Sequence, residues 1–200
     1  SRDRGEDFER RRFGASGTFR KVQGKDSDRS VGQAGRQKGW KTYFGYCVDT
    51  NGEWFGFQGR SLDVNDKMRY ITIMLDESKT KVFGLNRVDF DKTIYITEGP
   101  FDSLYIDNAI AMAGADVDWN ALDGKEVVFV YDNERRNKEI IARMKKAIDK
   151  GYEIVIWPEK LQEKDLYDMF IAGHDVQSLV EFNTYSGLEA QIKLSEWKKV

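Results

Sequence analysis

The sequence has one cysteine, one histidine and two prolines, and it has no long apolar run. One cysteine excludes a disulfide framework within these residues, and one cysteine with one histidine excludes a zinc module. No apolar stretch approaches the roughly 20 residues that cross a bilayer, and no signal-peptide core lies near residue 1. We therefore expect a reduced, cytoplasmic protein with no membrane partner.

What is present is typical of a globular chain: 200 residues, of which 40% are hydrophobic and 33% charged. That length suits one ordinary domain or two small ones that share a core. The net charge of −2 is unevenly distributed. Residues 1–97 hold 19 Lys and Arg against 14 Asp and Glu, whereas residues 98–200 hold 13 against 20. A basic front half and an acidic back half indicate different roles for the two halves.

The first region, residues 1–39, has few large apolar side chains. A segment of this kind buries too little surface to offset its chain entropy, which predicts a flexible basic arm. The alternative is an arm that orders on nucleic acid through cations that include Arg36 and Lys38.

The next region, residues 40–92, is β-prone and has few helical signals. Asn51-Gly52 is a strong hairpin-turn signal, because both residues tolerate a positive φ. We expect a small, mostly antiparallel β subdomain with strands at 42–48, 53–58, 70–75 and 81–84.

From residue 93 the pattern changes to short apolar strands that alternate with helical spacing. This order predicts an α/β fold, in which residues 93–175 form an open parallel four-stranded sheet with flanking helices. The expected strands are 93–97, 109–112, 126–131 and 153–157, and the expected helices are 101–107, 134–150 and 165–172. Residues 176–200 form a C-terminal helical segment in this prediction, with helices at 177–182 and 187–197.

Carboxylates follow the predicted strands at the ends where open α/β sheets bind ligands. Glu98 follows the first strand, Asp132 and Glu134 follow the third, and Asp102 lies one helical turn after Glu98. If the first and third strands are neighbours, these side chains converge, and unpaired carboxylates at close range repel one another. Bound Mg²⁺ or Mn²⁺ would compensate that charge and would indicate metal-assisted phosphoryl chemistry.

A structural explanation stands beside this hypothesis. Acidic residues often cap helices or complement the helix dipole, and Asp102, Glu134 and Asp165 each precede or open a predicted helix. Glu98 is harder to explain in this way, because Gly99-Pro100 makes a tight turn directly after it. The joint arrangement of Glu98, Asp132 and Glu134 favours metal binding.

The same acidic residues lie in motifs that resemble a known family. Residues 96–102 (Ile-Thr-Glu-Gly-Pro-Phe-Asp) resemble the E-G-x-x-D element of the Toprim domain, and residues 128–134 resemble its D-x-D element. Lys164-Asp165 with Asp168 resembles the third acidic segment of primases. The resemblance implies a Toprim domain with a Rossmann-like parallel sheet, a fold found in enzymes that act on phosphodiesters with divalent metal.

The front half narrows the resemblance to DnaG-type primases. Residues 54–62 are similar to the G-F-x-G-R-x-L segment of the basic subdomain that precedes Toprim in these enzymes. Residues 68–70 and 81–85 resemble the P-K-Y and L-Y-G-L elements, in the same order and at similar spacing. The resemblance covers roughly residues 43–175, and its details are most similar to primases of T-even-like bacteriophages.

The resemblance implies a DNA-dependent RNA primase core that synthesises short primers on single-stranded DNA. Two or more Mg²⁺ or Mn²⁺ ions would be the cofactors, and ribonucleoside triphosphates the substrates. Glu98 would be the central metal ligand and the base that assists the 3′-hydroxyl, while Asp132 and Glu134 would hold ions against the triphosphate. The outer or second-metal ligands would be Asp102, Asp165 and Asp168.

The resemblance also implies a nucleic-acid surface on the front half. Arg60, Lys67, Arg69 and Lys81 would contact template and nascent strand, mostly at phosphates. The alternative is a solvated basic surface. A replicative helicase is a further implied partner.

Two features depart from the family pattern. Glu134 stands where the family has Asp, and the zinc module that usually precedes the core has no ligands here, so it would have to lie on a separate polypeptide or be absent. Two other functions therefore stay open: a small Toprim metal-dependent nuclease, and a non-catalytic nucleic-acid-binding module.

Overall fold

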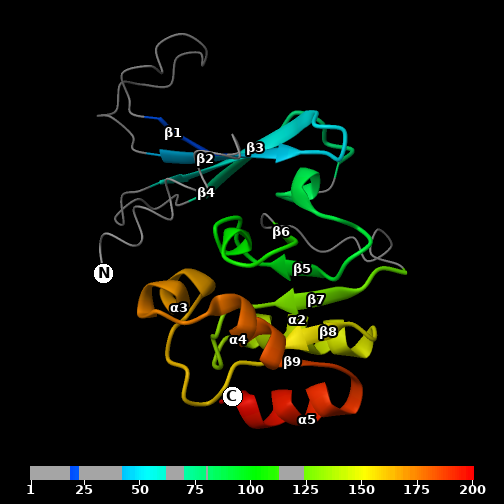
Figure 1. Cartoon of the computed structure of the whole chain (residues 1–200), viewed down its shortest axis with the longest axis vertical. Coiled ribbons are helices and arrows are strands. Elements are labelled where there is room, and N and C mark those ends of the chain that lie inside the picture. Colours follow the sequence, from blue (N-terminus) through cyan, green and yellow to red (C-terminus); the bar gives the residue numbers. More distant parts are fainter. Residues whose placement is uncertain (1–18, 23–41, 62–69, 80, 113–123) are drawn as a thin grey trace.

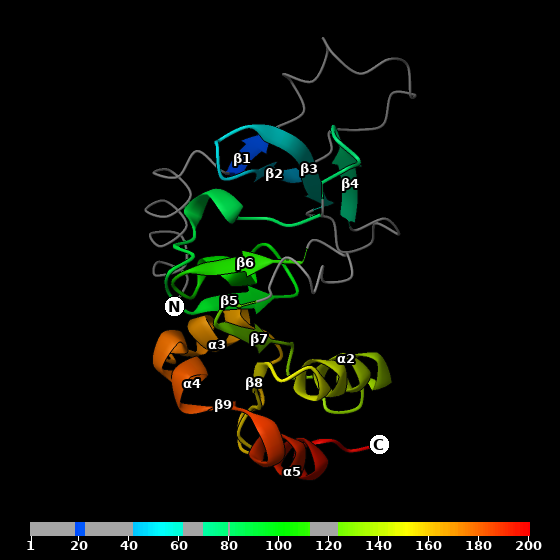
Figure 2. The same cartoon turned by 90° about the vertical axis from the view of Figure 1, so that its right-hand side faces the viewer.

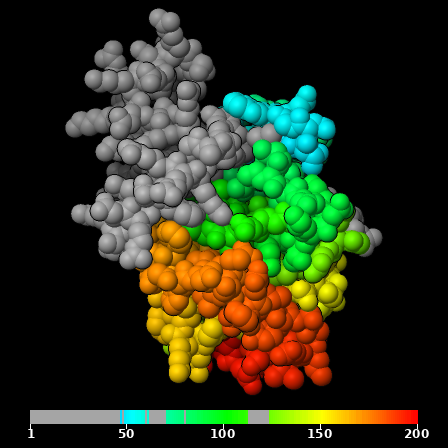
Figure 3. Space-filling model, in the orientation of Figure 1, coloured from blue at the N-terminus to red at the C-terminus, as the bar shows by residue number. Residues whose placement is uncertain are grey.

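The computed structural model describes residues 19–22, 42–61, 70–79, 81–112 and 124–200, and the structural statements below refer to these residues. They form two β-sheets, a small antiparallel one above a larger, mostly parallel one (Figure 1). The space-filling view shows the same order along the long axis, from the small sheet in cyan to the C-terminal helices in orange and red (Figure 3).

The small sheet is antiparallel throughout, with strand order β1-β2-β3-β4. In the loop between β2 and β3, the Asp49 carboxylate accepts hydrogen bonds from the backbone amides of Asn51 and Glu53, at 2.9 and 3.0 Å. The predicted β subdomain is therefore present, with Gly52 at a positive φ of 84°. Its strands are β1 (Phe19–Val22), β2 (Thr42–Val48), β3 (Trp54–Ser61) and β4 (Tyr70–Met74).

Two predictions for the front half differ from the structure. Phe19–Val22 was expected to lie within a flexible arm, but it forms β1. Pairing with β2 satisfies the backbone hydrogen bonds of this segment, and its composition carries no signal for that pairing. Residues 81–84 do not form a strand; only Phe83 pairs, through mutual backbone hydrogen bonds of 2.9 Å with Ala111. Phe83 is buried, and it fastens the connection between the two sheets to the larger one.

The larger sheet has strand order β6-β5-β7-β8-β9. Its first four strands are parallel, as predicted, and β9 adds an antiparallel edge strand that the sequence analysis missed. All four residues of β7 are buried, as expected for a central strand covered on both faces. The strands are β5 (Ile94–Thr97), β6 (Ala109–Ala111), β7 (Val127–Val130), β8 (Glu153–Val155) and β9 (Thr184–Tyr185).

Helices cover both faces of this sheet: α2 lies on one side, and α3 and α4 lie on the other (Figure 2). α2 buries a stripe at Ile140, Met144, Ala147 and Ile148, and α5 packs beside it. In the described part of the chain, none of the helices is long and apolar enough to cross a membrane. The helices are α2 (Lys138–Asp149), α3 (Leu166–Ala172), α4 (Val176–Phe182) and α5 (Gly187–Trp197).

Two predicted helices are shorter than expected. The segment after Glu98 forms only a 3-10 turn, η2 (Asp102–Leu104), in place of a helix over 101–107. α2 begins at Lys138 rather than at Glu134, because the Asn137 side chain caps its first turn. Both differences leave the acidic residues in loops at the carboxyl edge of the sheet.

Candidate catalytic and metal-binding site

The central strands place two of the predicted acidic segments side by side. β5 and β7 are adjacent and parallel, and Thr97 pairs with Val130 at their carboxyl ends. Glu98 and Asp132, which follow these two residues along the chain, therefore leave the sheet at one edge. The condition for convergence, that the first and third strands of this half are neighbours, is therefore met.

Two buried hydroxyl groups hold the turn that carries Glu98. Thr97 Oγ1 donates to the carbonyl oxygen of Gly99 at 3.0 Å, and Ser103 Oγ donates to that of Pro100 at 2.7 Å. Gly99 lies close to Asp102: a Cβ atom there would lie 2.7 Å from a carboxylate oxygen of Asp102, which would have to shift. The turn therefore brings the Asp102 carboxylate back against the residue that follows Glu98.

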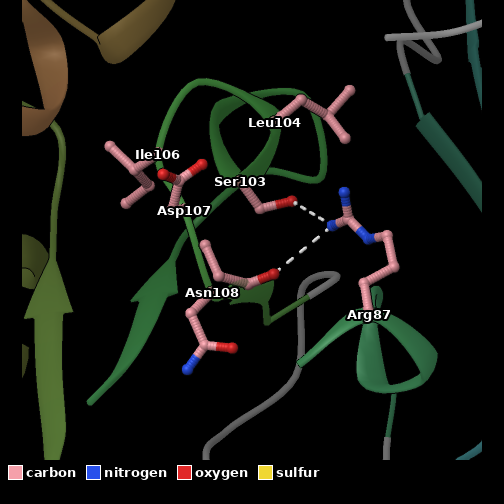
Figure 4. Close-up of a pocket in the computed structure, with 7 residues that line it drawn as sticks. Arg87, Ser103, Leu104, Ile106, Asp107 and Asn108 are labelled. Atoms are coloured by element: carbon pink, nitrogen blue, oxygen red, sulfur yellow. Dashed lines mark hydrogen bonds between the residues drawn. The ribbon is translucent and has the colours of Figure 1, made fainter. Parts of the chain in front are cut away.

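Arg87 braces this turn from the segment that connects the two sheets (Figure 4). It lies in the 3-10 turn η1 (Leu85–Arg87), and its Nη2 donates to Ser103 Oγ at 3.2 Å and to the carbonyl of Ala109 at 3.3 Å. Its guanidinium also lies 5.0 Å from the centre of the Phe83 ring. Arg87 and Ser103 border a pocket of about 210 Å³. The guanidinium thus links the connecting segment to the Glu98 turn.

Glu98 and Asp132 share an environment that disfavours two negative charges. Burial, and secondly the nearby Asp132 carboxylate, raise the pKa of Glu98 to about 7. Burial raises the pKa of Asp132 to about 6, although the Lys164 ammonium opposes that shift. Glu98 Oε1 is also buried without a hydrogen-bond partner. The Lys164 ammonium and the Arg143 guanidinium oppose these shifts without cancelling them, so the pair is short of positive charge, a condition that a bound cation relieves.

Glu134, in contrast, is well compensated. Its Oε2 accepts a hydrogen bond from Asn137 Nδ2 at 2.6 Å, and its Oε1 lies 2.8 Å from Lys164 Nζ. These two contacts hold the pKa of Glu134 below its usual value. Lys164 Nζ also lies 3.6 Å from Asp132 Oδ2, so one ammonium serves both carboxylates.

Asn133 attaches the third acidic segment to the end of β7. Its backbone amide donates to the carbonyl of Lys164 at 2.7 Å. Its side-chain Nδ2 donates to the carbonyls of Leu161 and Glu163 at 3.1 and 3.0 Å. This attachment places Lys164 and Asp165 beside Asp132, although they are some 30 residues away in sequence.

Asp165 and Asp168 lie at the start of α3. The Asp165 carboxylate caps the helix by accepting from the Asp168 amide at 2.8 Å, so the capping alternative holds for this residue. The Asp165 charge nonetheless contributes to raising the pKa of Asp132. Asp168 is exposed, and partial desolvation raises its pKa.

The donor chemistry of this edge fits Mg²⁺ or Mn²⁺. Glu98, Asp132 and Glu134 offer carboxylate oxygens, which these hard cations prefer, and Glu98 Oε1 is buried without a hydrogen-bond partner. Within the described ranges, however, no three Asp, Glu, His or Cys side chains form a group ready to hold a metal. Lys164 instead lies between two of the predicted ligands.

The predicted nucleic-acid residues are only partly described. Lys81 is exposed, and Arg60 lies on β3, where the structure describes its backbone pairing with Tyr70. The other four residues, namely Arg36, Lys38, Lys67 and Arg69, lie outside the described residues.

Comparison with known proteins gives this site a family context. No protein-family model matches the chain. The DNA primase of Enterobacteria phage T4 is 36% identical over 158 residues, which cover 76% of this chain and 46% of that protein. Over most of its length, the chain is therefore homologous to this phage primase. It spans less than half the length of this curated primase.

Solved primase structures share the fold. The RNA polymerase domain of Mycobacterium tuberculosis primase DnaG superimposes with a TM-score of 0.57 at 20% identity, covering 74% of this chain and 59% of that domain. A DnaG primase catalytic domain bound to single-stranded DNA gives a TM-score of 0.51 at 14% identity, over 71% and 52% of the two chains. The mixed α/β fold predicted from the sequence is thus that of a primase catalytic domain.

Several residues that shape this candidate site were not singled out from the sequence. Hydroxyl and amide side chains carried no signal, because their roles depend on carbonyl groups that only the fold brings near. One local signal was available. Asn137 Oδ1 accepts hydrogen bonds from the backbone amides of Glu139 and Ile140, two and three residues later, which is typical of an N-cap. The missed residues are Arg87, Thr97, Ser103, Asn133 and Asn137.

Proposed function

We propose that the chain is the catalytic core of a DNA primase, which joins ribonucleotides into short RNA primers on a single-stranded DNA template. The main supporting observation is that Glu98 and Asp132, which follow adjacent parallel strands, form a half-buried pair short of positive charge. The chain that holds this pair is a homologue of the T4 DNA primase. The DnaG catalytic domain bound to single-stranded DNA has the same fold, which supports that template.

Glu98, Asp132 and Glu134 would hold Mg²⁺ or Mn²⁺, with Asp102, Asp165 and Asp168 as outer ligands. A bound divalent ion would neutralise the triphosphate and polarise its phosphorus–oxygen bonds. The chain's own part is to position the carboxylates and to bind the template. Without metal, burial raises the pKa of Glu98 to about 7, and a bound cation would favour its ionised form.

The partners follow from the same proposal. Ribonucleoside triphosphates would bind at the acidic edge, and Arg60, Lys67, Arg69 and Lys81 would contact template phosphates, with Arg36 and Lys38 extending that surface. A replicative helicase and a zinc-binding module on another polypeptide would complete the priming complex in the cytoplasm of a bacterial host.

Template-dependent primer synthesis tests the proposal. With single-stranded DNA, all four ribonucleotides and Mg²⁺ or Mn²⁺, the chain should form short RNA products. Glu98→Gln and Asp132→Asn should each reduce synthesis at least ~100-fold. Asp149→Asn is a matched control, because Asp149 is an exposed carboxylate at the far end of α2.

The two other functions would give different results. Cleavage of nucleic acid with metal alone and without nucleotides would indicate a nuclease. Binding of single-stranded DNA with no synthesis, and no divalent-ion binding even with nucleotide present, would indicate a non-catalytic module. Full synthesis by both folded variants would contradict the proposed site.

A further inference from the structure

One lysine occupies the position between two of the proposed metal ligands. Lys164 Nζ lies 2.8 Å from Glu134 Oε1 and 3.6 Å from Asp132 Oδ2. The two carboxylate side chains are 29% and 21% exposed, whereas the lysine side chain is 54% exposed. The ammonium therefore approaches the pair from the solvent side.

The surrounding contacts hold both partners of this ion pair in place. The Lys164 carbonyl accepts from the Asn133 amide at 2.7 Å, and the Glu163 carbonyl before it accepts from the Asn133 side chain. On the other side, the bond from Asn137 to Glu134 Oε2 turns Oε1 toward the lysine. This is a built arrangement rather than a chance meeting of two surface chains, which would contribute little.

We propose that Lys164 is the internal counter-ion of this site, and that a divalent ion has to displace its ammonium from Glu134 and Asp132 in order to bind. The proposal rests on the proposed function, because it takes these carboxylates as metal ligands. An ammonium at hydrogen-bond distance occupies the oxygen lone pairs that a metal needs, and its charge repels the incoming ion. Displacement is feasible, because lysine has a long flexible stem and its half-exposed ammonium is readily hydrated.

In the described part of the chain, the acidic residues of this edge do not form a ready metal group, and Lys164 lies between two of them. Lys164 compensates part of the site in the absence of metal. Metal affinity is then set by competition between one ammonium and the divalent ion.

Direct binding of Mn²⁺ without nucleotide tests the inference. Lys164→Met removes the charge and keeps most of the stem, so Mn²⁺ should bind at least threefold tighter by calorimetry at pH 8. Lys164→Arg keeps a cation and should bind within twofold of the wild type. Lys160→Met, at an exposed lysine of the same loop, should also bind like the wild type.

Thermal unfolding gives a readout that does not depend on activity. In EDTA, Lys164→Met should melt at a lower temperature than the wild type, because two carboxylates lose a shared cation. Mn²⁺ should then raise its melting temperature by more than it raises that of the wild type. Lys164→Gln replaces the methionine variant if the latter does not fold.

The outcomes separate this inference from the proposed function. Unchanged or weaker Mn²⁺ binding by Lys164→Met overturns the counter-ion role, whatever the primer assay shows. Tighter binding in that variant, with Glu98→Gln binding Mn²⁺ like the wild type, supports the counter-ion role and contradicts the placement of Glu98 in the proposed site. No Mn²⁺ binding by the wild type or by Lys164→Met overturns both.

Discussion

At the scale of single residues, carboxylates of similar chemistry have different properties because their surroundings differ. Glu98 is half-buried, has one oxygen without a partner and lies near another carboxylate, so its pKa rises to about 7. Glu134 has two hydrogen-bonding partners, and its pKa falls. The residue type predicted a candidate ligand at each position, but the number of neighbouring donors decided which carboxylate remains short of positive charge.

The raised pKa of Glu98 predicts a dependence of stability on pH. Between the ordinary glutamate pKa of 4.5 and about 7, the folded chain keeps a proton on Glu98 that the unfolded chain has released. Without divalent metal, the free energy of unfolding should therefore fall as pH rises through this window. Glu98→Gln removes the effect and should be more stable than the wild type at pH 8 by about 1–2 kcal/mol, allowing for partial exposure.

Urea unfolding at pH 5 and pH 8 in EDTA measures this difference. Glu189→Gln is a suitable control, since Glu189 is an exposed carboxylate in the first turn of α5. If Glu98→Gln were more stable than the wild type by the same amount at pH 5 and at pH 8, Glu98 would not be the titrating group.

At the scale of elements, the local sequence predicted most strands and the longer helices. The ends of β2 and α5 were predicted exactly, and those of the other elements differ by one to a few residues. The alternation around Asn51-Gly52 and the apolar run before Asp132 are strong local signals, and both produce strands. The helical spacing after Glu98 was misleading: the apolar side chains of Leu104 and Ile106 are buried by the tertiary fold, without a regular helix. β1 and β9 depend on pairing with β2 and β8, which are distant from them in the sequence, so the local pattern carried no signal for them.

Asn137 permits a test of how one element end orients a site residue. It caps α2, with its Oδ1 accepting from Glu139 and Ile140, and it donates to Glu134. Asn137→Ala loses both functions and should destabilise the chain by about 1 kcal/mol. Asn137→Ser keeps a capping oxygen but lacks the longer amide group whose Nδ2 reaches Glu134, so its stability should lie within a few tenths of a kcal/mol of the wild type.

Denaturant unfolding measures the stability of the two variants, and Mn²⁺ titration measures the metal affinity of the site. Both variants should change Mn²⁺ affinity to a similar extent, because both release Glu134 Oε2. An affinity change in the alanine variant alone would mean that the cap, and not the bond to Glu134, matters for the site.

At the scale of the whole molecule, charge is divided along the chain and not between the two sheets. Residues 1–41 hold 12 Lys and Arg against 6 Asp and Glu, residues 42–97 hold 7 against 8, and residues 98–200 hold 13 against 20. Phe83 and Arg87 connect the two sheets, because one pairs with β6 and the other braces the Glu98 turn. A polyanion bound across the front half would reach the carboxylate edge only with cations in between.

This division predicts salt-dependent binding of single-stranded DNA. Lys81→Ala removes one phosphate contact of the proposed surface, so the slope of log affinity against log salt should become shallower by about 0.7. Lys198→Ala, at the exposed C-terminal end of α5, should leave the slope unchanged. Fluorescence anisotropy across a salt series measures both, and equal slopes for the two variants would exclude Lys81 from the DNA contact.

The sequence by itself determined the α/β class, the parallel character of four strands and the carboxylates at their ends, because strand burial and strand-end position are local properties of residue pattern. It also placed the chain near primases through Glu98, Asp132 and the motifs around them. Only the tertiary structure decided that Lys164 lies between Glu134 and Asp132, that Arg87 braces the Glu98 turn, and that Asn133 carries the third acidic segment to the site. These contacts join residues far apart in the chain, and their energies depend on distances that no local pattern encodes.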